Sequence, residues 1–170
     1  MYKIGDLIIY GSYGVCRVEA IGAPDISGLE ENREYYTLCP FYQNGKIFTP
    51  VDTSVFMRPV ITNEKAQQLI DLIPSIRADL NTSSNSKLVE EQYQESMQTH
   101  DCCDLIKVIK TVYNKRVIAV GQGKKLGQID ERYMKKAEDL LYGELAVALG
   151  MPREDVRSYI EGRVNEMVAG

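Results

Sequence analysis

The sequence of 170 residues contains no tryptophan, a single histidine, and four cysteines, no two of which form a CxxC pair. This spacing argues against a disulfide framework and against a zinc site, so we expect reduced thiols. His100, Cys102 and Cys103 lie together, but neighbouring residues at a helix start point in different directions. We interpret the cysteines as buried or half-buried filling residues. We therefore expect no enzyme, no metal and no cofactor.

Long apolar runs are also absent. Residues 1–6 have no apolar signal core, and no run approaches the ~20 apolar residues of a membrane span. Hydrophobic residues make up 44% of the chain and charged residues 26%, which is typical of a soluble globular protein. We expect a cytoplasmic protein without a membrane partner, and the length suits one ordinary domain or two small ones.

Residues 1–58 have the pattern of a small antiparallel sheet. The stretch GDLIIYGSYGVCRVEAIG at 5–22 reads as two strands joined by a tight turn, and Asn44-Gly45 between two apolar runs is a strong hairpin signal. The pattern predicts strands near 6–10, 14–21, 35–39 and 46–49. Four or five short strands with these turns predict a compact barrel or half-barrel of the Tudor or SH3 kind.

From residue 59 onward the apolar residues follow helical spacing, and we predict a helical bundle over 59–170. Thr62 or Asn63 is the expected cap of the first helix, and Asp101 that of the third. The polar segment 81–86 is expected to precede a second helix at 87–98. The fourth helix is expected near 128–149, after a glycine-lysine loop at 121–127, and Gly150 and Pro152 separate it from a fifth. Among the side chains we expect to face inward are Tyr113 and Met167. The predicted fold class is α+β.

The net charge of −4 is spread unevenly along the chain. Residues 107–136 carry nine basic and two acidic side chains, a net charge of +7, whereas the flanking segments 59–106 and 137–170 carry −5 and −4. Charge runs usually only solvate a helix face. Segregation of this kind is also what binding to a phosphate backbone uses, and the charge pattern alone leaves both interpretations open. The nine cations are Lys107, Lys110, Lys115, Arg116, Lys124, Lys125, Arg132, Lys135 and Lys136.

Three stretches together resemble the CarD family of transcription regulators. GDLIIYGSYGVCRVEAI at the start resembles the domain that CarD regulators share with the transcription-repair coupling factor. DCCDLIKVIKTVYNKR at 101–116 and ERYMKKAEDLLYGELAVALG at 131–150 resemble the last helices of CarD regulators. The resemblance covers nearly the whole chain, and the ATPase motor of the coupling factor is absent. A full-length CarD regulator is therefore the closer match.

The resemblance implies a transcription regulator without catalytic activity. In this family the Tudor-like domain binds the β subunit of RNA polymerase, and the helical domain contacts promoter DNA at the upstream edge of the bubble, without reading sequence. We place polymerase binding in residues 1–58, on the hairpin that a partner could extend or cover, at Lys46, Ile47 and Phe48. Phe48 fits a core position equally well. The predicted DNA-binding residues are Ser86, Lys87, Lys107, Lys110, Lys124, Lys125, Arg132, Lys135 and Lys136.

The chain departs from the family pattern at two places. Family members usually carry a tryptophan at the start of the second helix of the helical domain, where it wedges against the minor groove, but this chain has Asn85-Ser86-Lys87 there. The family's proline-histidine-glycine turn is Gly11-Ser12-Tyr13-Gly14 here. The first departure removes the expected wedge, and we expect the second to alter only a turn.

A second function fits the same residues. In this alternative the chain is a protein–protein adaptor on RNA polymerase, and its helical domain binds only protein partners. The two hypotheses differ in one property, because only a DNA-binding domain gives an association with DNA that weakens as salt increases.

Overall fold

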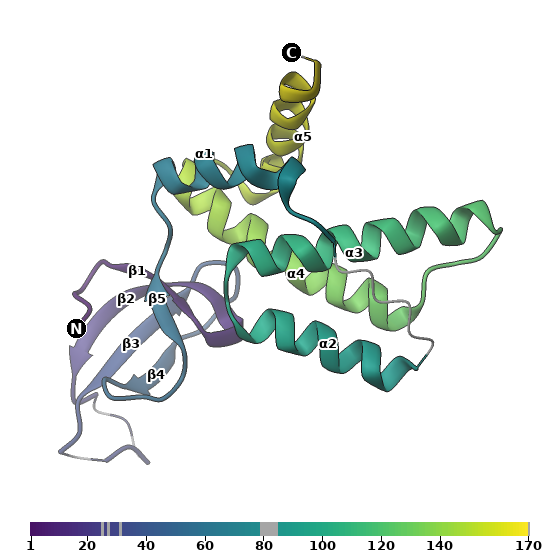
Figure 1. Ribbon diagram of the computed structural model, residues 1–170. Coiled ribbons are helices and arrows are strands. Elements are labelled where there is room, and N and C mark those ends of the chain that lie inside the picture. The colour runs from purple at the N-terminus through teal and green to yellow at the C-terminus, as the bar shows by residue number, and fades with distance from the viewer. Residues whose placement is uncertain (25, 27, 31, 79–84, 170) are drawn as a thin grey trace. The chain divides into compact units, whose positions relative to one another are not determined.

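The structure is a computed structural model that describes residues 1–24, 26, 28–30, 32–78 and 85–169, with side chains described as far as residue 166. It divides into two compact units, Met1–Ile61 and Thr62–Gly170. The first unit is a β-sheet and the second is a group of α-helices (Figure 1). The predicted α+β class is confirmed. Most of the expected polar segment 81–86 lies outside the described residues.

The described strands of the first unit form one antiparallel sheet. They are β1 (Leu7–Tyr10), β2 (Gly14–Gly22), β3 (Tyr35–Pro40), β4 (Ile47–Pro50) and β5 (Met57–Pro59). Their order across the sheet is β4-β3-β2-β1-β5, so β4 and β5 are its two edges. A short 3₁₀ turn, η1 (Gly11–Tyr13), joins β1 to β2. Gly14 then begins β2 at a φ of 77°, a backbone conformation that only glycine adopts readily.

One face of the sheet carries an apolar core. Side chains at alternate positions of a strand point to the same face, which explains why Ile8 and Tyr10 of β1 share this core. Its other buried members are Cys16, Val18, Tyr36 and Leu38. The Tyr10 hydroxyl donates a hydrogen bond to Thr49 Oγ1 at 3.0 Å, and both residues are buried. This bond joins β4, at one edge of the sheet, to the interior.

The sequence predicts four or five strands but gives no range for β5. This strand has only three residues and ends at Pro59, which cannot donate to a ladder, so its sequence signal is weak. In the structure it pairs with β1, with Met57 opposite Tyr10 and Pro59 opposite Ile8. The sheet unit therefore continues past residue 58, where we expected its end, to Ile61.

The second unit contains five α-helices within its described residues. They are α1 (Asn63–Leu72), α2 (Ser86–Gln98), α3 (Cys102–Gly121), α4 (Gln128–Leu149) and α5 (Arg153–Ala169). A 3₁₀ turn, η2 (Ile73–Ser75), follows α1. Thr62, Asn85 and Asp101 cap three of the helices, because their side chains accept hydrogen bonds from backbone amides in the first turn. Gly150 ends α4, as predicted, and does so in the left-handed conformation.

Helices α3 and α4 pack along each other and supply most of the buried side chains of this unit. Leu105, Val108 and Val112 of α3 are buried, as the helical spacing predicts. The prediction for Tyr113 is wrong, because its side chain is 58% exposed. The periodicity of α3 was read as if the whole helix were covered, but its second half is mostly exposed. The side chain of Met167 lies outside the described part.

The four cysteines have free thiols, and their burial predicts which of them react. Cys16 is fully buried, and this burial raises the pKa of its thiol from 9.0 to about 11. A buried thiol with a raised pKa supplies almost no thiolate near neutral pH. We therefore expect a thiol reagent at mildly alkaline pH to label Cys39, which is half-buried, and to spare Cys16 until the protein is unfolded. Mass spectrometry of the labelled peptides measures this, and equal labelling of both before unfolding would contradict it.

Candidate functional site

Strand β4 offers one exposed edge of the sheet. It pairs with β3 alone among the described strands, with Phe48 opposite Thr37 and Ile47 opposite Leu38. An edge strand of this kind presents unpaired backbone groups, to which an extended segment of another protein can add. Of the surfaces on the first unit, this edge is the candidate docking site.

The three predicted docking residues divide between two roles. Ile47 packs against the apolar core, so its side chain is structural. Phe48 is half-buried and, by the alternation of the strand, points to the face opposite the core. Lys46 is exposed and forms a 3.3 Å ion pair with Glu19. Phe48 and Lys46 are therefore the side chains of this set that a partner can reach.

The basic segment of the second unit is partly neutralised by the fold. Three of its cations form ion pairs with carboxylates outside the segment, and a fourth pairs with Asp130 inside it. The pairs are Lys107 with Asp104 (3.6 Å), Lys115 with Asp130 (3.1 Å), Arg132 with Glu90 (2.5 Å) and Lys135 with Asp139 (3.5 Å). Part of the net charge of +7 is thus a property of the sequence segment and not of the folded surface.

A pair of tyrosines occupies the contact between α2 and α4. The rings of Tyr93 and Tyr133 lie 5.4 Å apart, and the Tyr93 hydroxyl donates to the Asp130 carboxylate at 2.5 Å. Burial, and then the hydrogen bond to Asp130, raise the pKa of Tyr93 far above its usual value, so the hydroxyl stays protonated. Lys136 lies over the Tyr133 ring at 5.2 Å. The Tyr93–Tyr133 pair, together with Asp130 of α4 and Lys115 of α3, therefore joins α2, α3 and α4.

Lys110 has a structural role that the sequence did not indicate. Its ammonium group donates to the backbone carbonyls of Ile73 and Ile76, which follow the end of α1. The partial burial of the group lowers the pKa of Lys110. Its proposed contact with DNA remains a prediction, although the side chain already bonds within the unit.

Four other predicted cations, Lys87, Lys124, Lys125 and Lys136, are exposed and have no ion-pair partner in the described part of the chain. Lys124 and Lys125 are exposed in the loop between α3 and α4. Near this loop, a hollow of about 410 Å³ is lined by residues that include Ser86 at the start of α2 and Gly127 and Gln128 at the start of α4. Helix starts present unpaired backbone amides, which favour anions. We call this region, formed by 86–88, 116–121, the loop 122–127 and Gln128, the loop end of the helical unit.

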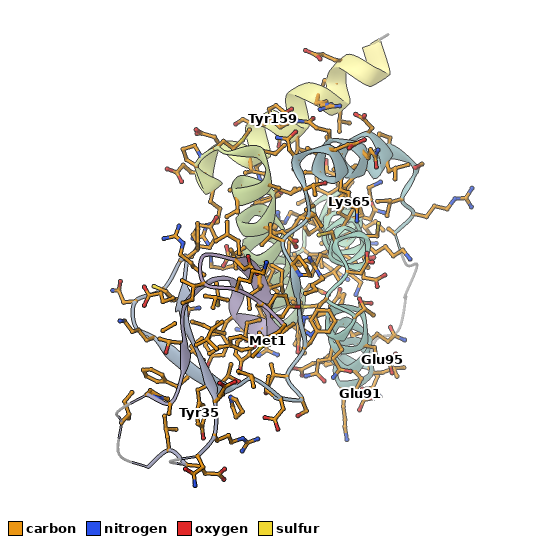
Figure 2. All side chains as sticks on the ribbon, turned by 90° about the vertical axis from the view of Figure 1, so that its left-hand side faces the viewer. Met1, Tyr35, Lys65, Glu91, Glu95 and Tyr159 are labelled. Carbon is orange, nitrogen blue, oxygen red and sulfur yellow. The ribbon has the colours of Figure 1, made fainter. Side chains whose placement is uncertain are left out.

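The acidic side chains of α2 lie away from its start. Glu91 and Glu95 are exposed one helical turn apart, in the middle of the helix (Figure 2). Glu90 is paired with Arg132. A polyanion would be repelled along this stretch of α2 and attracted toward the loop end, where Lys87, Lys124 and Lys125 are exposed.

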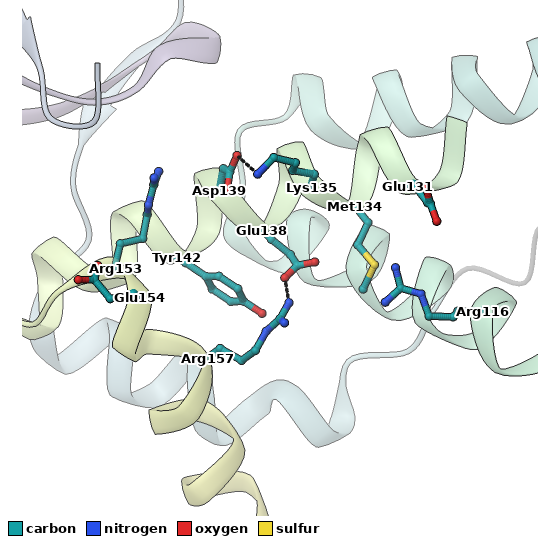
Figure 3. A pocket seen from close by; sticks show the side chains of 10 residues that line it. All are labelled: Arg116, Glu131, Met134, Lys135, Glu138, Asp139, Tyr142, Arg153, Glu154 and Arg157. Atoms are coloured by element: carbon teal, nitrogen blue, oxygen red, sulfur yellow. Dashed lines mark hydrogen bonds and ion pairs between the residues drawn. The ribbon is translucent and has the colours of Figure 1, made fainter. Parts of the chain in front are cut away.

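A larger pocket between α3, α4 and α5 has balanced charge. Its volume is about 520 Å³, and the side chains that line it are drawn in Figure 3. Four cations and four carboxylates line it, and the Arg157–Glu138 and Lys135–Asp139 pairs span part of it. The lining residues are Arg116, Glu131, Met134, Lys135, Glu138, Asp139, Tyr142, Arg153, Glu154 and Arg157. No excess of either charge marks it as a site for an ionic ligand.

Within the described residues, no three His, Cys, Asp or Glu side chains lie together as a metal site. The same part of the chain contains no helix long and apolar enough to cross a membrane. The sequence gives no indication that Glu144 is buried, but its carboxylate accepts a 3.3 Å hydrogen bond from the Cys102 thiol inside the unit. A single glutamate within an apolar helical stripe gives no sequence signal for burial.

The comparison with known families concerns the first unit. Residues 2–61 match the family model of the CarD-like/TRCF RID domain. These boundaries nearly coincide with those of the sheet unit, Met1–Ile61. An RID of this family is a non-catalytic domain that interacts with RNA polymerase in transcription. The resemblance that we expected over nearly the whole chain is confirmed for the matched residues.

We expect the contact of Asp130 with Lys115 and Tyr93 to stabilise the helical unit. Both ion-pair side chains are largely buried, at 17% and 24% exposure. We expect Asp130→Asn to lower the free energy of unfolding by about 1–3 kcal/mol, since it leaves a poorly solvated ammonium group without its counter-charge. Asp139→Asn, which breaks the exposed pair with Lys135, is expected to cost less than about 1 kcal/mol.

Denaturant unfolding followed by far-UV circular dichroism measures both changes in the full chain. An equal loss of stability in the two variants would contradict the structural role of the Asp130 contact.

Proposed function

Because the first unit of this chain belongs to the CarD-like/TRCF RID family, we propose that the protein is a transcription regulator that binds the β subunit of RNA polymerase through this unit and contacts promoter DNA through its helical unit. The family match over residues 2–61 is the observation that carries the proposal. The protein acts without catalysis, in the cytoplasm of a bacterial cell.

The polymerase contact uses the β4 edge. A strand of the polymerase adds to the exposed backbone of β4, and the side chains beside it supply specificity. Phe48 supplies a half-buried aromatic surface and Lys46 a charge at the start of the strand. The hydrogen bond of Thr49 to Tyr10 supports this role, because it holds the edge strand in place before a partner binds.

The DNA contact uses the loop end of the helical unit. Lys87, Lys124 and Lys125 are exposed there, and the starts of α2 and α4 add the positive ends of two helix dipoles. Ser86 at the start of α2 supplies a hydroxyl that can donate to a phosphate. These groups recognise the DNA backbone and not its sequence.

The two contacts act together through effective concentration. A few phosphate contacts give weak binding on their own, but a chain already held on polymerase meets the promoter as an intramolecular partner. The regulator thereby alters the stability of the open complex during initiation. Binding to polymerase brings the protein to the promoter, and the DNA contact of the helical unit changes the stability of the open complex.

If the β4 edge binds polymerase, a double substitution at this edge should weaken that binding. We expect Lys46→Glu with Phe48→Ser to weaken the binding of the full chain to a β-subunit fragment by about tenfold or more, because both accessible side chains of the edge are lost. Val55→Ser is the matched control. Val55 is exposed beside Gly11, outside β4, and its variant should bind as the parent does. Calorimetric titration measures both, and unchanged affinity in the double variant would move the interface elsewhere.

If the loop end binds DNA phosphates, the affinity for DNA should depend on salt concentration. With polymerase present, the logarithm of DNA affinity should fall linearly with the logarithm of salt concentration, by roughly 0.9 for each phosphate contact. Lys124→Gln with Lys125→Gln should make this slope less negative by about 2. Lys107→Gln with Lys135→Gln removes two cations that are already paired, and the slope should change little. A slope near zero in the parent would favour the adaptor that binds only proteins.

A further inference from the structure

Asn44 and Gly45 lie in the connection between β3 and β4, beside the proposed docking edge. Residues 41–45 form bends outside any strand or helix, and both Asn44 and Gly45 are exposed. Gly45 has a φ of 103°, a backbone conformation that residues with a side chain rarely adopt. As a sequence pattern the pair predicts a turn. It also has a chemical property, because the backbone nitrogen that follows an asparagine can attack the asparagine side chain.

This reaction consumes only water. The Gly45 nitrogen forms a bond to Cγ of Asn44 and gives up its proton, and the side-chain amide leaves as ammonia, so that a cyclic imide remains. Water then adds to one of the imide carbonyls and opens the ring. Opening at one carbonyl gives aspartate at position 44. Opening at the other gives isoaspartate, in which the main chain passes through the former side chain.

The structure leaves the reacting atoms accessible. Within the described part of the chain, neither the Asn44 side chain nor the Gly45 amide has a hydrogen-bond partner. No acceptor therefore holds the Gly45 N–H, and no donor or acceptor holds the Asn44 amide away from it. Glycine has no Cβ that would shield its nitrogen from attack on the preceding side chain. Asn44 is the only asparagine of the sequence that glycine follows.

Asn114 provides a comparison within the same chain. It is also exposed, but it lies inside α3 and is followed by Lys115. A residue inside a helix donates its backbone N–H to the carbonyl four positions earlier, so the Lys115 nitrogen is already engaged. Lys115 also has a Cβ beside this nitrogen. We therefore expect the Asn114 amide to persist under conditions in which the Asn44 amide is lost.

The connection that contains Asn44 determines how β4 pairs with β3. In a hairpin the register depends on the turn and its length, and here Ile47 lies opposite Leu38. An isoaspartate adds a methylene group to the main chain of this connection. Either product also places a carboxylate two residues from Lys46, which is paired with Glu19 at 3.3 Å. The conversion therefore alters both the backbone and the charge at the start of the β4 edge.

We propose that Asn44 is a site of spontaneous modification, and that its conversion to isoaspartate disrupts the β4 edge and thereby weakens binding to RNA polymerase. The weakened binding rests on the proposed function, whereas the conversion itself does not. A newly made chain keeps the paired edge, and an old chain loses it. The conversion accelerates as pH rises, because the attacking Gly45 nitrogen must lose its proton.

The first test incubates the purified full chain in mildly alkaline buffer and follows each asparagine by peptide mass spectrometry. Most of the Asn44 amide should be lost while Asn114 keeps its own. The isoaspartate should then accept a methyl group from S-adenosylmethionine in the presence of protein-isoaspartate methyltransferase. The Asn44→Gln variant keeps an amide but would have to form a larger ring, so it should stay unmodified at this position. Equal persistence of the Asn44 and Asn114 amides in the parent would overturn the inference.

The second test passes the incubated parent over an immobilised β-subunit fragment. Isoaspartate should be enriched in the chains that fail to bind, and Asn44→Gln incubated in the same way should bind as it did before. An equal content of isoaspartate in the bound and unbound chains would overturn the proposed effect on docking.

Hydrogen exchange of the β4 peptide separates this inference from the proposed function, because it needs no polymerase. Exchange should be faster in the incubated parent than in the fresh parent, and unchanged in Asn44→Gln. If fresh chains fail to bind the fragment while isoaspartate and faster exchange are found, the proposed function and the effect on docking fail and the modification stands. If fresh chains bind and the incubated parent shows neither isoaspartate nor faster exchange, the inference fails and the proposed function stands.

Discussion

Ion pairing between neighbouring helices decides which charges of the helical unit are available to a partner. The Asp130 carboxylate accepts from both Lys115 and Tyr93, and it thereby binds α4 to α3 and to α2. Glu90 does the same for Arg132 across the contact of α2 with α4. These carboxylates pair with cations between the helices, Lys115 largely buried and Arg132 at the surface. Of the exposed lysines of this unit that form no ion pair within the described residues, Lys87, Lys124 and Lys125 lie at the loop end, whereas Lys65 lies on α1 and Lys136 lies over the Tyr133 ring.

In the sheet unit, too, only some groups are available to a partner, in this case backbone groups at the strand edges. Its strand order pairs the inner strands on both sides and leaves an edge at β4 and another at β5. Both edge strands end in a proline, and β5 has three residues against the four of β4. Strand β4 is longer, and Thr49 fastens it to the core through Tyr10. The greater length of β4 and this hydrogen bond favour docking at β4.

Much of this architecture could be predicted from local sequence signals. Caps such as Thr62 and Asp101, the stop at Gly150 and the alternating strand residues all act within a few positions of themselves, so the sequence shows them directly. The exposed side of α3 could not be predicted, because Tyr113 and Val120 continue the apolar composition of a helix that is buried earlier. The apolar pattern is a property of α3 alone, whereas the burial of its side chains depends on how far the neighbouring helices extend along it.

The candidate site was less predictable than the fold because its side chains interact with residues far away in the sequence. Lys110 binds carbonyls 37 and 34 residues away, and Arg132 pairs with a glutamate 42 residues away. A count of charges along the sequence treats such cations as available. By contrast, the sequence does contain one signal for the loop end, since residues 105–129 have no acidic side chain that could neutralise its lysines.

The most direct test of the central claim is capture of the tagged full chain from a nuclease-treated extract of the cells that make it. The account predicts that the large subunits of RNA polymerase are recovered with the tag after nucleic acid has been digested, because docking uses the sheet unit and not DNA. Capture that repeatedly recovers no polymerase subunits, from an extract in which the tagged chain is intact, would contradict the account.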